Sequence, residues 1–102
     1  MKPYLEERIA ACRQKEAALV ADSRADEAVF EKIRANVYEI FLTIWNMGRG
    51  EDFFREKMEA IPKNWQAAYD RARTHEEIAA MTLETVKLDT AKEIMEEWEA
   101  RA

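Results

Sequence analysis

The scarcity of turn-forming residues constrains this chain more than any other feature of its sequence. Its 102 residues include only two glycines, two prolines and one serine. A β-sandwich or β-barrel needs a tight turn after every short strand, and these residue types supply most such turns. The sequence therefore predicts long helices with few connections, and an all-α fold.

The length and composition are those of one folded domain. A compact protein of this mass exposes about 6,000 Å², against about 17,000 Å² when unfolded, so it can build a core without a metal or a disulfide. Hydrophobic residues make up 48% of the chain and charged residues 36%, a composition that argues against disorder. We expect residues 1–102 to form a single helical domain.

Local signals divide the chain into four or five helices. Pro3 suits a first turn, where its missing N–H costs no hydrogen bond. Asp22 or Ser23 offers a side-chain cap, and Gly48 offers the left-handed residue that ends a helix. Pro62 is expected to stop a short helix. We predict a compact bundle of helices at about residues 3–21, 23–47, 52–60, 64–73 and 75–98, arranged around the helix at 23–47.

The division of the last third of the chain rests on weaker signals, because no glycine or proline follows residue 62. Asn64 is a candidate N-cap for the helix at 64–73. The residues Thr74-His75-Glu76-Glu77 fit a capping box, in which Glu77 reaches back to the start of the helix. This makes His75 a helix-start residue. One long kinked helix over residues 64–98 is the alternative.

The helix at 23–47 carries more apolar residues than a surface helix needs. Eight of the eleven residues at 37–47 are apolar, so this helix must be covered on most sides. Any part left uncovered would be a large apolar patch, which monomers seldom expose. We therefore expect a homodimer, with Tyr38, Leu42 and Trp45 as its self-association surface.

The polar residues of the same helix form one narrow stripe with spacings of 4, 3, 4 and 3: Lys32, Asn36, Glu39, Thr43 and Asn46. One interpretation is a solvent-exposed ridge on an otherwise buried helix. The other is a ligand groove formed by Asn36, Glu39, Thr43 and Asn46. A buried Glu39 would then need a cation, either Lys32 or an arginine of another helix, because an unpaired buried carboxylate is costly.

The charge distribution disfavours polyanionic partners. The net charge is −5, and residues 76–102 hold eight acidic and three basic side chains. Such a field repels nucleic acids and anionic lipids. We expect the acidic helix to stay ordered through Trp98, which should pack on the bundle, and to fray after it. Its acidic surface should suit a basic protein. The absence of a long apolar run or a signal-peptide pattern predicts no membrane partner and a cytoplasmic location.

Motifs for catalysis, metals and cofactors are missing from the sequence. Cys12 lies at helical spacing from Leu5 and Ile9, which favours a buried, inert thiol. His75 is the only histidine, and Ala79 stands where a zinc-protease motif needs its second ligand. We therefore predict no catalytic residues, no metal and no cofactor.

These patterns lead to three hypotheses about function. The first is a non-catalytic protein-interaction module that self-associates. The second is a ligand-binding domain or small enzyme that uses the polar stripe. The third is a DNA-linked regulator, in which the helices at 52–60 and 64–73 form a helix-turn-helix about residues 61–63, although Asp70 would then face phosphate.

Overall fold

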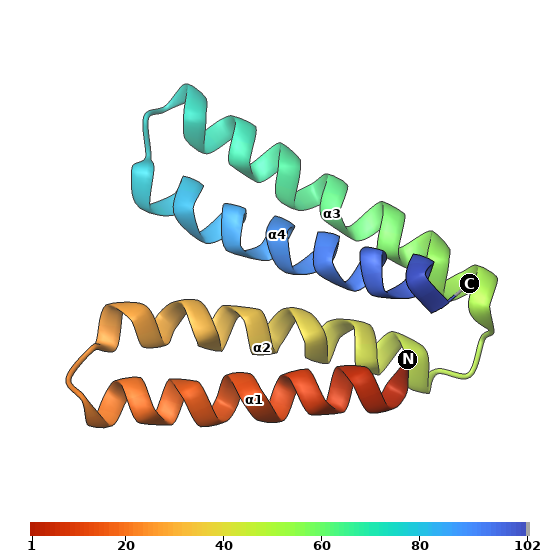
Figure 1. Ribbon diagram of the computed structural model, residues 1–102. Coiled ribbons are helices and arrows are strands. Elements are labelled where there is room, and N and C mark those ends of the chain that lie inside the picture. Colours follow the sequence, from red (N-terminus) through yellow and green to blue (C-terminus); the bar gives the residue numbers. More distant parts are fainter. Residues whose placement is uncertain (102) are drawn as a thin grey trace.

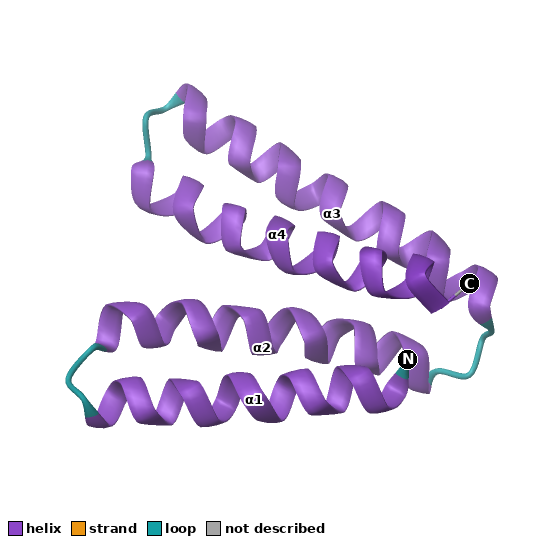
Figure 2. Ribbon diagram, viewed as in Figure 1, coloured by secondary structure: helices purple, strands orange, loops and turns teal. Residues whose placement is uncertain are grey.

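The computed structural model describes residues 1–101 and confirms the all-α prediction. Its four helices are α1 (Lys2–Ala21), α2 (Ala25–Asn46), α3 (Glu51–Thr74) and α4 (Ile78–Arg101). No strand is present in this part of the chain, and three short connections join the helices (Figure 2).

The helices form two hairpins, α1–α2 and α3–α4, that lie side by side (Figure 1). Helix α2 packs along α1 and α4 and also contacts α3. The hairpins meet near residues 47–50, which we call the closed end, and diverge toward residues 22–24 and 75–77, the open end. The accessible surface of 6601 Å² exceeds the about 6,000 Å² of a compact protein of this size. This excess agrees with two hairpins that pack against each other along only part of their length.

The hydrophobic core lies mostly toward the closed end. Phe54 of α3 is 1% exposed. Its ring meets Trp45 of α2 at 5.2 Å and Trp98 of α4 at 5.3 Å between centroids. Trp98 thus packs on the core, as the sequence predicted. The buried core residues from all four helices are Leu5, Cys12, Ala35, Val37, Tyr38, Phe41, Ile44, Phe54, Met58, Ala91 and Ile94.

Of the two predictions for the ends of α2, one is confirmed and one is wrong. Gly48 has φ +68°, the left-handed conformation expected of it. At the other end the N-cap is Arg24, with no side-chain hydrogen bond, so neither Asp22 nor Ser23 caps α2. Ser23 instead has φ 60° and donates its N–H to the Val20 carbonyl, because it completes the turn that ends α1.

Helix α3 continues through Pro62, so the predicted helices at 52–60 and 64–73 are one. Proline removes one backbone hydrogen bond, here the one to the Met58 carbonyl, at a cost of about 3 kcal/mol. Packing of α3 along α4 on both sides of this residue offsets that cost. Asn64 is therefore no N-cap, and the helix-turn-helix interpretation is wrong because residues 61–63 are helical.

The chain does break near Thr74, so residues 64–98 are not one kinked helix. The predicted capping box is wrong, however. The Thr74 hydroxyl donates to the Asp70 carbonyl at 2.9 Å, within α3. His75 is the C-cap of α3, and α4 begins at Ile78. Helix α4 continues beyond Trp98, where fraying was expected, and ends at Arg101, whose guanidinium lies 2.8 Å from Glu97 within the last turn.

Candidate functional site

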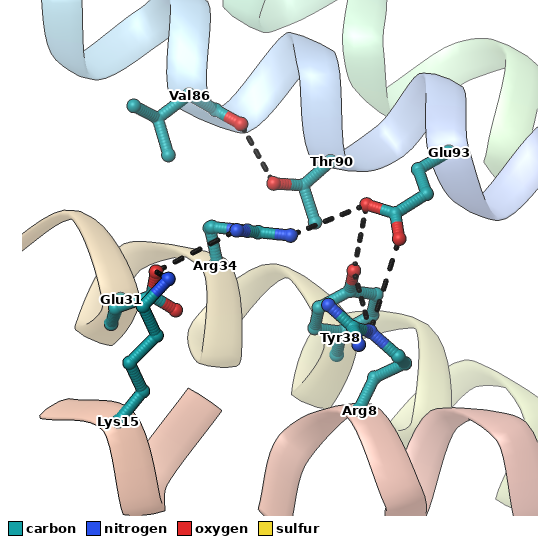
Figure 3. Close-up of polar contacts among 8 residues, drawn as sticks. All are labelled: Arg8, Lys15, Glu31, Arg34, Tyr38, Val86, Thr90 and Glu93. Carbon is teal, nitrogen blue, oxygen red and sulfur yellow. Dashed lines mark hydrogen bonds and ion pairs between the residues drawn. The ribbon is translucent and has the colours of Figure 1, made fainter. Parts of the chain in front are cut away.

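The most extensive polar contacts join α1, α2 and α4 (Figure 3). This polar cluster contains three cations, two carboxylates and a phenol hydroxyl, from Arg8 and Lys15 of α1, Glu31, Arg34 and Tyr38 of α2, and Glu93 of α4. It links the two hairpins beside the hydrophobic core. Its members lie up to 85 residues apart in the sequence, Arg8 to Glu93.

Glu93 is the acceptor that connects α4 to the other hairpin. The Tyr38 hydroxyl donates to Glu93 Oε2 at 3.0 Å, and Arg34 Nη2 lies 3.4 Å from the same oxygen. Arg8 Nε donates to the Tyr38 hydroxyl at 3.3 Å and lies 3.8 Å from Glu93 Oε1. One carboxylate therefore binds groups from both α1 and α2.

Glu31 is the second carboxylate of the polar cluster, and it is only 7% exposed. Lys15 Nζ lies 3.4 Å from Glu31 Oε1, and Arg34 Nη1 lies 3.6 Å from the same atom. Burying a charged carboxylate costs hydration free energy, and nearby cations offset that cost. Arg34 is the residue that connects both carboxylates, and it therefore unites the whole cluster.

Burial determines the protonation of the two weak acids beside these charges. It raises the pKa of the Tyr38 hydroxyl, and the charge of Glu93 raises it further, so Tyr38 remains a hydrogen-bond donor. Burial also raises the pKa of the Cys12 thiol. Cys12 is 2% exposed, which confirms its predicted burial and favours the unreactive thiol form.

A hollow of about 400 Å³ adjoins the polar cluster between α2 and α4. Its lining is Phe30, Glu31, Arg34, Val86, Asp89, Thr90 and Glu93. The Thr90 hydroxyl donates to the Val86 carbonyl at 2.8 Å within α4, as Figure 3 shows. The charged groups of this lining other than Asp89 pair with one another across the cluster, so the arrangement fastens the hairpins together.

The predicted polar stripe lies on the outside of the α1–α2 hairpin. Asn36, Thr43 and Asn46 are exposed, and Glu39 is half-buried. Arg13 of α1 donates to Glu39 Oε1 at 2.8 Å and to Asn36 Oδ1 at 3.3 Å. An arginine of another helix is thus the partner of Glu39. The exposures agree with a ridge, and the groove stays a prediction.

The predicted self-association surface is wrong at Tyr38. This residue is 0% exposed, because its ring packs in the core and its hydroxyl joins the polar cluster. Leu42 and Trp45 are half-buried against the same core.

The sequence interpretation missed a different apolar line on α2. Val29, Ile40 and Met47 are exposed by 45%, 40% and 56%. With the half-buried Ile33 and the exposed Asn36 and Thr43, they follow alternating spacings of 4, 3, 4, 3 and 4, which place six residues on one side of a helix. We call this line the α2 seam: Val29, Ile33, Asn36, Ile40, Thr43 and Met47. Its spacing was the signal that could have revealed it.

Further hollows lie on the α3–α4 hairpin and at the closed end of the molecule. The α3–α4 groove, of about 370 Å³, is lined by Met58, Pro62, Leu88, Ala91, Lys92, Met95, Glu96 and Glu99. A hollow of about 420 Å³ at the closed end is lined by Met1, Trp45, Glu51, Asp52, Arg55, Trp98 and Arg101.

Residues 1–101 hold no group of three or more histidine, cysteine, aspartate or glutamate side chains that could bind a metal ion. None of the four helices in this part of the chain is long and apolar enough to cross a membrane. Comparison with known protein families, characterised proteins and solved structures gives no match to this chain.

Proposed function

We propose that this protein is a non-catalytic interaction module that self-associates through the α2 seam. The observation that carries the proposal is the gathering of exposed apolar side chains on one helix face. Five large hydrophobic residues are exposed in the part of the chain described, and three of them, Val29, Ile40 and Met47, belong to the seam. Monomers seldom leave such a line uncovered.

The geometry of the seam suits a second helix. Its six residues extend over about 27 Å at the rise of an α-helix. Their alternating 4 and 3 spacing is the pattern that packs against another helix in a coiled coil, with branched side chains filling the contact. Asn36 and Thr43 interrupt the apolar line, and polar residues at such positions select the register of pairing.

A second copy of the chain is the occupant that the flanking charges favour. Lys32 and Glu39 lie seven residues apart beside the seam. In an antiparallel pair related by a twofold axis, Lys32 of each copy would lie opposite Glu39 of the other, with Val29 opposite Ile40. Twofold pairing is the commonest form of assembly among soluble proteins.

In this proposal α2 is the central helix of the assembly. Its inner sides contact α1, α3 and α4, and its outer side contacts the second copy. A contact based on one helix pair is smaller than the about 800 Å² per partner of a standard interface, so we expect dissociation in the micromolar range. We also propose a cytoplasmic location. Cysteine thiols stay reduced in the cytoplasm, and Cys12 is a free cysteine.

The test is the mass of the chain by light scattering and sedimentation equilibrium across the micromolar range. We expect the mass to approach twice 12.0 kDa as the concentration rises. The double variant Val29→Glu, Ile40→Glu should remain monomeric, because it places carboxylates in the seam of both copies.

A matched control is the double variant Val20→Glu, Ile78→Glu. These residues are exposed by 59% and 75% but lie outside the seam, and the change in net charge is the same. This variant should dimerise like the natural chain. A natural chain that stays monomeric at high micromolar concentration contradicts the proposal, and so does equal dissociation of both variants.

A further inference from the structure

The α3–α4 groove combines an adaptable apolar floor with a carboxylate rim. Met58 and Ala91 are buried, while Leu88 and Met95 are half-buried and form its open part. Methionine is flexible and polarisable, so it adapts to differently shaped apolar partners. The floor therefore suits apolar side chains from outside the molecule.

The acidic groups of the last turns of α4 divide into paired and unpaired ones. Glu93 contacts Arg34 and Arg8, and Glu97 contacts Arg101. Glu96 and Glu99 line the α3–α4 groove, and no cation of residues 1–101 lies within 4.0 Å of either carboxylate. Lys92 is the single cation of the lining. The rim is thus net negative, and its two carboxylates lie one turn apart on the same side of α4.

We propose that the α3–α4 groove binds a basic amphipathic helix of a partner protein. Apolar side chains of that helix occupy the floor formed by Met58, Leu88 and Met95, and its lysine or arginine side chains pair with Glu96 and Glu99. Charge complementarity selects this occupant, because a polyanion would meet the same carboxylates and the net charge of −5. The apolar floor distinguishes it from a merely polycationic segment.

The experiment is a titration of a fluorescein-labelled peptide with the full chain, followed by fluorescence anisotropy. The peptide contains only leucine and lysine, with the leucines on one face of a helix. A second peptide has the same composition in an order that leaves no apolar face. We expect the first to bind at least about tenfold more tightly, because it can bury leucine side chains in the groove. Its binding should shift the methyl resonances of Met58, Leu88 and Met95.

The decisive variant is Glu96→Gln, Glu99→Gln, and its matched control is Glu6→Gln, Glu7→Gln on exposed positions of α1. Both remove two charges. The groove variant should weaken binding roughly tenfold and the control less than about twofold, since only the former removes ion pairs with the peptide. Absence of binding to the natural chain, equal binding of both peptides or equal weakening by both variants overturns the proposal. The Val29→Glu, Ile40→Glu chain should bind the peptide normally, because this site is independent of the α2 seam.

Discussion

The closed and open ends of the molecule are stabilised by different interactions. At the closed end, Trp45 packs edge to face against Phe54 and Trp98, and the Phe54 and Trp98 rings are tilted by 47° to each other. At the open end the hairpins separate, and Val20 and Ile78 are exposed. The polar cluster adds charged contacts between the hairpins, from Arg8, Arg34 and Tyr38 to Glu93.

This difference shows that helix formation and hairpin placement have separate causes. At the open end all four helices keep their helical turns although no shared core joins them there. Their backbone hydrogen bonds are internal to each helix, so they do not depend on such a core. The position of one hairpin against the other depends on the closed-end aromatic rings and on the polar cluster. Substitutions in these regions should therefore differ greatly in effect.

The largest effect is expected for Phe54→Ala at the closed end. Removing this buried ring leaves a cavity among Phe41, Trp45 and Trp98, and such changes lower the free energy of unfolding by about 3–5 kcal/mol. Ile78→Ala at the open end should change it by about 0.5 kcal/mol or less. Urea denaturation measures both values. Similar losses for the two variants would contradict the assigned difference between the ends.

A smaller effect is expected for Tyr38→Phe in the polar cluster. The ring remains in the core, but Glu93 loses its 3.0 Å hydrogen bond and Arg8 loses its acceptor. A hydrogen bond to a charged group contributes about 1.5–3 kcal/mol, so the free energy of unfolding should fall by up to that amount. Tyr69→Phe on α3 is the control outside the cluster. If both variants behave alike in urea denaturation, the cluster does not fasten the hairpins.

The pH dependence of the melting temperature tests the role of the same hydroxyl. The pKa of Tyr38 is raised in the folded protein, chiefly by burial, so folding favours its neutral form. The resulting stabilisation is fully present below the pKa of an unfolded tyrosine, about 10, and is lost as the pH rises through the folded pKa. The melting temperature should therefore fall in alkali, and less steeply in Tyr38→Phe. An unchanged slope would assign the alkaline loss to other groups, such as Tyr4, whose pKa burial also raises.

The smallest effect is expected for Glu39→Gln on the outer ridge. Arg13 Nη2 lies 2.8 Å from Glu39 Oε1, but the side chain of Glu39 is 45% exposed and that of Arg13 is 39% exposed. Exposed ion pairs contribute little, so the free energy of unfolding should change by about 0.5 kcal/mol or less. A loss of several kcal/mol in urea denaturation would instead support the ligand-groove interpretation of Asn36, Glu39, Thr43 and Asn46.

Local signals in the sequence were sufficient for several features. The scarcity of turn residues predicted an all-helical chain, and Gly48 marked the end of α2 because it takes a left-handed conformation there. Helical spacing predicted the burial of Cys12, and Trp98 was expected to pack on the bundle. Each of these depends on neighbours within a few positions or on one strongly apolar side chain.

Pro62 and Tyr38 show where local signals misled. Proline predicted a helix end, since the sequence reveals the lost hydrogen bond but not the packing of α3 on α4 that outweighs it. Tyr38 was predicted on the self-association surface because it lies in the apolar stretch of α2. The sequence does not reveal the hydrogen-bond partners of its hydroxyl. Those partners lie 30 and 55 residues away.

The sequence by itself therefore determined that the chain is helical and, apart from the break predicted at Pro62, about where its helices end, because backbone hydrogen bonds and turn conformations are local. Only the tertiary structure decided which helix faces are covered, which carboxylates have cations, and where the hairpins meet. The polar cluster, the α2 seam and the α3–α4 groove all depend on these choices. The physical reason is that apolar surface is buried between segments distant in the sequence. Local spacing marks an apolar helix face, but it does not show which distant segment covers that face.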